Sequence, residues 1–373
     1  MPPTAAHQAT NLPLRSKQEI DAMPLSDDVT ESGLAHEVEP AELPEPAPAA
    51  SSAGRSPLAA GIRPDEPMAE AVRKIMYRQY QTMLANEAGC RSGKSIDAVH
   101  DMRVATRRLR VALRLFGGYF KRGLVRDLET DLRKTGRTLG AARDLDVFNK
   151  TARLYLRSLP KAQRSDLDPL LASWKRQRQV AHRELVDYFD SARYQRLLDK
   201  LGDFLTSPGA GVAAGKPPAA APVQLRHVLV STVWLRYEAV RAYEAVLPEA
   251  VPETLHALRI ECKYLRYTLE FFQEVLDHSA AALIRQVIAV QDHLGEIQDA
   301  DVATRLLADY LAKAYKEQAS AGVVTAADLD GVSHYLGHRR EQARQMTASF
   351  PQLWKQIDSA RFRRRLAVAL VSL

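Results

Sequence analysis

A repeat within the chain constrains its fold more than any other feature of the sequence. Residues 100–116 align without a gap on residues 256–272. Six aligned pairs are identical, namely His100/His256, Arg103/Arg259, Leu109/Leu265, Arg110/Arg266, Leu113/Leu269 and Phe116/Phe272. The motif L-G-x-x-x-D then occurs at residues 139–144 and again at 294–299. Two matched segments at offsets of 156 and 155 residues indicate a tandem duplication.

Composition separates an N-terminal tail from a foldable body. Residues 1–67 hold 11 of the 20 prolines, 11 acidic residues against 4 basic ones, and no Phe, Trp or Tyr. Such an acidic, Pro/Ala-rich segment cannot bury enough apolar surface to order itself, so we expect it to be disordered. Subtracting it from the totals of 52 basic and 45 acidic residues leaves 48 and 34, so the body is strongly basic.

The body, residues 68–373, has the pattern of an all-α protein. Its segments are rich in Leu, Arg, Ala, Glu and Lys, and their apolar residues are spaced three and four apart. A stretch of Gly, Pro and Ala over residues 206–222 predicts a linker. We therefore expect two helical bundles, over residues 68–205 and 223–373, with about four helices in each.

Each copy of the repeat predicts a helix with one cationic edge. Successive helical residues are about 100° apart, so the basic side chains of the first copy fall within about 80° of arc. We call these edges the basic stripes: His100, Arg103, Arg107, Arg110 and Arg114 in the first copy, and His256, Arg259, Lys263 and Arg266 in the second. In the second copy Glu270 takes the last position, and in both copies the apolar residues cluster on the opposite side.

The charges of the first stripe lack acids on their own helix. Basic helix faces are commonly solvated or paired with acids three or four residues away. Between residues 100 and 116 the only acid is Asp101, which points off the stripe. We therefore expect an anionic partner. Ser95 and Pro252 predict helix starts just before each stripe, where the helix dipole also favours anions.

At these residues the sequence resembles the CHAD family, the α-helical domain named for its histidines. The resemblance covers residues 68–373 and includes both stripes and both L-G-x-x-x-D motifs. It implies two four-helix bundles related by a pseudo-twofold axis, with the basic helices facing a central groove. It also implies binding of inorganic polyphosphate and, in several bacterial members, location on polyphosphate granules.

The chemistry of the stripes fits that ligand. A linear chain of phosphates offers no side groups to recognise, so it needs a series of cations, and Arg provides paired donors to phosphate oxygens. The reference pKa of His, about 6.5, predicts that the two histidines gain charge, and the protein gains affinity, between about pH 8 and 6. Further candidate cations are Arg133, Arg137, Arg143, Arg176 and Arg183. Asp144 and Asp299 either orient stripe arginines or form plain structural pairs.

Two other functions compete with this one. A basic helical module that binds nucleic acid is the first, although stacking aromatics and zinc-finger motifs are not evident. A metal-dependent phosphohydrolase of the HD type is the second, suggested by His100-Asp101. It needs an upstream His ligand, and only His7 and His36 precede, both in the tail. We expect a non-catalytic, cytoplasmic protein on polyphosphate granules, with no metal, cofactor or membrane segment.

Overall fold

The computed structural model describes residues 61–213, 223–321 and 326–373, and these form helices joined by short connections. The first half contains α2 (Met68–Ser92), α3 (Ile96–Phe116), α4 (Arg122–Ser158), α5 (Asp168–Asp190) and α6 (Ala192–Thr206). The second half contains α7 (Leu225–Arg241), α8 (Pro252–Phe271), α9 (Ala280–Ala321), α10 (Ala326–Ile357) and α11 (Ala360–Ala369). The all-α prediction is confirmed, and each half has four longer helices and a shorter fifth one.

Local signals explain where the two stripe helices begin. The hydroxyl of Ser95 caps α3 by accepting a hydrogen bond from the backbone N–H of Ala98 at 3.0 Å. Pro252 occupies the first residue of α8, where a missing N–H costs no hydrogen bond. On α3, Met102, Leu109 and Leu113 are almost fully buried, so the predicted apolar face is the one that packs.

Equivalent residues of the two halves meet across a pseudo-twofold axis between α3 and α8. Phe116 and Phe272 end the two copies of the repeat, and their rings pack edge to face with centroids 5.4 Å apart. The chain segments entering α2 and α7 also pair, since the N–H of Met68 donates to Val223 at 2.9 Å. The N–H of Leu225 donates in return to the carbonyl of Glu66 at 2.9 Å.

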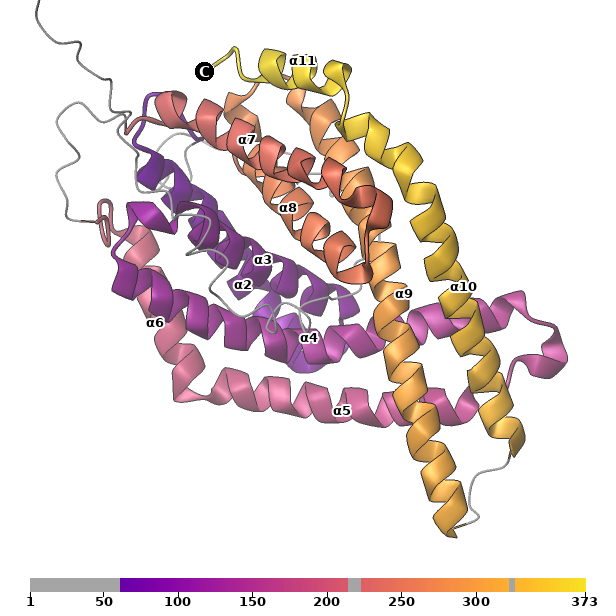
Figure 1. Cartoon of the computed structure of the whole chain (residues 1–373). Helices are drawn as coiled ribbons and strands as arrows, with labels where there is room; N and C mark the ends of the chain where they lie inside the picture. The colour runs from indigo at the N-terminus through magenta and orange to yellow at the C-terminus, as the bar shows by residue number, and fades with distance from the viewer. Residues whose placement is uncertain (1–60, 214–222, 322–325) are drawn as a thin grey trace, which may run out of the picture.

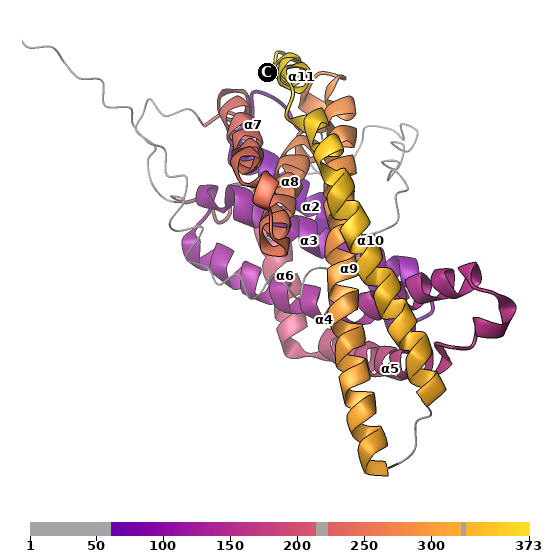
Figure 2. The ribbon, with the colours of Figure 1, turned by 45° about the vertical axis from the view of Figure 1, so that its right-hand side comes forward.

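The halves share two hydrophobic cores. The larger core includes buried side chains from α2, α3, α7, α8 and the first part of α9. The smaller core lies where the α4–α5 and α9–α10 hairpins cross, as Figures 1 and 2 show. There Phe148 and Trp174 of the first half share a cluster with Leu307 and Tyr335 of the second. Neither half therefore buries its apolar surface alone.

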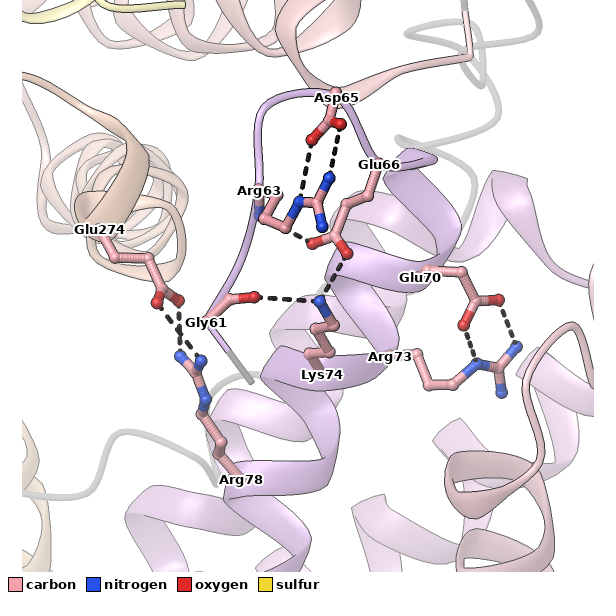
Figure 3. Close-up of polar contacts among 9 residues, drawn as sticks. All are labelled: Gly61, Arg63, Asp65, Glu66, Glu70, Arg73, Lys74, Arg78 and Glu274. Atoms are coloured by element: carbon pink, nitrogen blue, oxygen red, sulfur yellow. Dashed lines mark hydrogen bonds and ion pairs between the residues drawn. The ribbon is translucent and has the colours of Figure 1, made fainter. Parts of the chain in front are cut away.

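The described structure includes residues that the sequence analysis assigned to the tail. Residues 61–67, assigned above to the tail, lie along α2, and Ile62 is buried. Lys74 donates to the carbonyl of Gly61 at 3.0 Å and to Glu66 at 2.6 Å, while Arg78 pairs with Glu274 of the second half at 2.7 Å (Figure 3). The rest of the expected tail, residues 1–60, lies outside the described residues.

The expected linker also differs in part from the structure. Residues 207–213 pack against the start of α4, because Lys121 donates its N–H to Gly211 at 2.7 Å and Ala213 donates to Tyr119 at 3.1 Å. Arg73, fully buried on α2, donates to the carbonyls of Phe204 and Ala210 and pairs with Glu70. Residues 214–222 lie outside the described part of the chain.

None of the helices described is long and apolar enough to span a bilayer.

Candidate functional site

The first basic stripe lies on α3 and is less exposed than a solvated helix face. Arg103 is only 8% exposed, His100, Arg107 and Arg110 are half-buried, and Arg114 is exposed. The second stripe lies on α8, where His256, Arg259, Lys263 and Arg266 are all half-buried. Burying so many cations is unfavourable without compensation, so the groups that face them determine what the site can do.

The fold brings the centres of the two stripes together. Arg103 and Arg259 occupy the same position in the two copies. Burial lowers the pKa of Arg103, and the neighbouring charges of Arg107, Arg259 and Arg143 lower it further, against the opposing carboxylate of Asp144. Positive charge from both halves is therefore concentrated near the pseudo-twofold axis.

The L-G-x-x-x-D motifs explain how these arginines are held. A Cβ added at Gly140 of α4 would lie 3.7 Å from Nε of Arg103, and one added at Gly295 of α9 would lie 3.7 Å from Nε of Arg259. In each half, the stripe arginine therefore crosses its neighbouring helix at the glycine. The aspartate follows four residues later, one helical turn along the same face.

Both motif aspartates lie beside arginines, with Asp299 buried and Asp144 half-buried. Burial raises the pKa of Asp144 to about 6, although Arg103 and Arg143 favour its ionised form. Burial likewise raises the pKa of Asp299 to about 8, against the charges of Arg259 and Arg339. The two carboxylates also face each other closely enough for Asp144 to raise the pKa of Asp299. Because the surroundings penalise charge here, these acids compensate the arginines only in part.

The two histidines sit in different surroundings. Burial, followed by the charges of Arg143 and Arg107, lowers the pKa of His100 to about 4, so the histidine is neutral at pH 7 in the free protein. The reference pKa used above is therefore wrong for this residue. In the second half, Gln298 takes the place of Arg143 in the motif, and its Oε1 lies 2.8 Å from Nδ1 of His256.

Side chains of α3 and α8 contact each other beside the stripes. Nε of Arg107 donates to the hydroxyl of Tyr267 at 2.9 Å. Glu270 pairs with Arg266 on its own helix at 2.5 Å and with Arg108 of α3 at 2.8 Å. Glu270 thus pairs with one stripe arginine on its own helix and with an arginine of α3 that lies off the first stripe.

Only one of the further candidate cations is clearly placed in this cluster. Arg143 is buried on α4, and its charge acts on His100, Arg103 and Asp144. The others are Arg133 and Arg137 on α4 and Arg176 and Arg183 on α5. Arg133 is half-buried and the other three are exposed, and none is among the main charges acting on the central residues.

Sequence reasoning missed several residues of the site. Gln298 was detectable, because it occupies the position of Arg143 in the second motif. Tyr267 and Arg108 lie on the stripe helices but off their cationic edges, and Arg339 of α10 lies outside both repeated segments. Their roles depend on how helices pack, which helical spacing does not encode.

A metal centre has no support among the residues described, since no three His, Cys, Asp or Glu side chains gather to hold an ion. Asp146, two residues after Asp144, turns away to pair with Arg178 of α5 at 3.1 Å. The histidines that the phosphohydrolase alternative needs, His7 and His36, lie outside the described part of the chain.

A family model of the CHAD domain matches residues 74–308, which include both stripes and both motifs. The chain belongs to the CHAD domain family. Members of this family are linked to polyphosphate, and the CHAD domain is generally a non-catalytic binding domain.

Individual relatives agree with this assignment. Two uncharacterised proteins of Mycobacterium tuberculosis, MT2285 from strain CDC 1551 and Rv2226 from strain H37Rv, are each 28% identical over 244 residues, which is 64% of this chain and 45% of theirs. The chain thus spans less than half the length of these curated relatives. The CHAD domain from the plant Ricinus communis is 25% identical, with a TM-score of 0.58 over 83% of this chain and 94% of that one.

A second solved structure, PptA from Streptomyces chartreusis, has the same fold. It is 17% identical, with a TM-score of 0.58 over 78% of this chain and all of that one.

Proposed function

We propose that this CHAD domain binds inorganic polyphosphate, without catalysing a reaction on it, through the cationic cluster that α3 and α8 form at the pseudo-twofold axis. One observation carries the proposal: equivalent arginines of the two copies, Arg103 and Arg259, lie close enough for each to oppose the charge of the other. Such a concentration of positive charge is stabilised by an anion that contacts both helices.

A polymer of phosphates suits this cluster better than a single small anion does. Each stripe runs along its helix for several turns, so successive phosphates can contact successive basic side chains. The carboxylates of Asp144 and Asp299 lie beside the central arginines, which supports a positioning role for them. Arg107 is held at its Nε by Tyr267, so its terminal nitrogens remain oriented for an incoming phosphate oxygen.

A binding titration tests the proposal. Long-chain polyphosphate, orthophosphate and duplex DNA are titrated separately into the protein at two salt concentrations. We expect polyphosphate to bind most tightly and DNA to bind more weakly with a loss at the higher salt, because only the general charge attracts it. Equal affinity for DNA and polyphosphate would favour the nucleic-acid alternative. Absence of polyphosphate binding would refute the proposal.

A paired substitution tests the assigned residues. R107Q/K263Q removes one half-buried cation from the same position of each stripe. We expect it to weaken polyphosphate binding by about 10²- to 10⁴-fold, since each of the two charge-assisted contacts contributes about 1.5–3 kcal/mol. The matched control is R176Q/R183Q, which removes two exposed cations from α5 and should change the affinity less than about twofold.

The R107Q/K263Q variant also tests where the protein is located in the cell. We propose that the protein associates with polyphosphate granules through this cluster. A fluorescent fusion of the wild type should coincide with granules stained for polyphosphate, and the R107Q/K263Q fusion should not. A variant that still coincides with granules would place the attachment elsewhere in the chain.

A further inference from the structure

The sign of the charge is reversed at one pair of equivalent positions in the repeat. Arg114 of α3 corresponds to Glu270 of α8 in the repeat. Arg114 lies over the ring of Tyr264, with its guanidinium carbon 5.8 Å from the ring centroid. On the other side, Glu270 contacts Arg108, which is the repeat equivalent of Tyr264. An arginine–aromatic contact on one side is therefore replaced by an ion pair on the other.

Glu270 engages two arginines from two helices at once. Its Oε1 accepts a hydrogen bond from Nε of Arg266 at 2.5 Å, and its Oε2 accepts one from Nη1 of Arg108 at 2.8 Å. The three side chains are 11%, 23% and 21% exposed, respectively, so the ion pair lies at the surface but is largely shielded from water. Ion pairs in such surroundings are screened less by salt than fully exposed ones.

The same two arginines also pack against one aromatic ring. The guanidinium carbons of Arg108 and Arg266 lie 5.3 and 5.8 Å from the ring centroid of Tyr267. Two guanidinium groups fixed on one ring are a favourable setting for a tetrahedral anion, because each presents N–H donors in a fixed plane. The carboxylate of Glu270 occupies the place between them.

We propose that Glu270 is a built-in anion that fills the phosphate position between Arg108 and Arg266. This inference rests on the proposed function. Glu270 ends the polyphosphate-binding surface on the α8 side, so the polymer binds along the axis and the α3 side. A phosphate can take the position only by displacing a carboxylate that is already tethered beside it, at an effective concentration in the millimolar range or above. The two halves are thus related by sequence but unequal as binding surfaces.

Removing this charge tests the inference. E270Q keeps the shape of the side chain and leaves both arginines without their carboxylate. We expect it to bind long-chain polyphosphate about 3- to 10-fold more tightly at low salt, with a steeper decrease of affinity as salt rises, since more cations now contact the polymer. The matched control is E341Q, which removes the acid paired with Arg344 at 2.6 Å on the exposed face of α10 and should change the affinity less than about twofold.

R266Q provides a second and independent measurement. The gain of E270Q depends on the freed guanidinium group of Arg266, so in the E270Q background this substitution should remove the gain. If E270Q lacks a native thermal transition, E270D is titrated in its place. Its shorter carboxylate cannot hold both arginines as Glu270 does, so it should also bind polyphosphate more tightly than the wild type, by less than E270Q.

Three results would contradict the inference: E270Q binding no more tightly than the wild type, E341Q gaining as much as E270Q, or R266Q/E270Q keeping the whole gain of E270Q. Each of these presupposes that the wild type binds polyphosphate. A wild type that does not bind refutes the proposed function and this inference together, so the two failures are distinguishable.

Discussion

Individual charged residues of this CHAD domain have protonation equilibria set by burial and by neighbours contributed by other helices. His100 is the clearest case, because burial comes first among the causes that lower its pKa to about 4, followed by the charges of Arg143, Arg107 and Arg103. The charge of Asp97 opposes them. A bound polyanion would add negative charge beside the imidazole and raise its pKa.

The affinity for polyphosphate should therefore rise as the pH falls. The pKa of His100 is higher in the complex than in the free protein, where it is about 4. Binding therefore takes up protons at every pH between these two pKa values. The rise continues from pH 6 to pH 5, whereas a free histidine with a pKa of about 6.5 would have levelled off. Calorimetry at pH 7, 6 and 5 measures it. Asp144 and Asp299, with pKa values of about 6 and 8, also titrate beside the central arginines. H100Q should therefore reduce the slope between pH 6 and pH 5 without abolishing it, and an H100Q variant that keeps the full slope would exclude His100 as a source.

At the scale of the helices, the site depends on a close crossing between a stripe helix and a motif helix. The side chain of Arg103 passes over Gly140, and that of Arg259 passes over Gly295. In both halves a Cβ added at the glycine would lie 3.7 Å from Nε of the arginine. This distance is an ordinary contact for a methyl group, so alanine fits where a larger side chain does not. Glycine within a helix also costs stability relative to alanine.

G140A should therefore raise the free energy of unfolding by about 0.5–1 kcal/mol and leave polyphosphate binding unchanged. G140L should displace Arg103 and weaken binding, because its longer side chain occupies the place of the guanidinium group. Thermal denaturation and a titration of each variant measure the two effects. G123L is the control on the same helix, where an added Cβ meets nothing within 4 Å. Equal binding by G140L and the wild type would show that the crossing is not needed.

At the scale of the whole molecule, the two halves form one folding unit. Both hydrophobic cores contain residues from both halves, and the crossing hairpins are in close contact at Gly331 of α10. A Cβ at Gly331 would lie 2.5 Å from Cβ and 2.6 Å from the backbone oxygen of Asp166, in the connection before α5. We expect a single thermal transition for the whole chain.

G331A tests this close approach. It should destabilise the protein by about 1–3 kcal/mol, because the added methyl group meets backbone atoms of the other half. G337A lies on the same helix, where an added Cβ meets nothing within 4 Å, and should instead stabilise by about 0.5–1 kcal/mol. Chemical denaturation measures both. Equal stability of the two variants would contradict the packing described for the hairpins.

Binding should also depend on both halves together. A polyphosphate long enough to contact α3 and α8 engages the second helix intramolecularly, which adds about 10²- to 10⁴-fold in avidity where the geometry allows it. We expect affinity to increase steeply with chain length in the wild type. The increase should be much smaller in R259Q/K263Q, whose second stripe has lost its central charges. Calorimetry with a series of chain lengths measures this, and an unchanged series in the variant would mean that the halves bind separately.

The sequence by itself determined the helical class, the duplication and the two basic stripes, because helical spacing and the repeat are local properties of the chain. It also identified Gly140, Asp144 and their second copies as a motif, but could not say what they contact. Only the tertiary structure decided that Arg103 is buried, that Arg143 joins His100 and that Glu270 also pairs with Arg108 of α3. These features depend on contacts between helices that are far apart in sequence. Packing and burial decide which charges meet there, and the period of a single helix does not encode them.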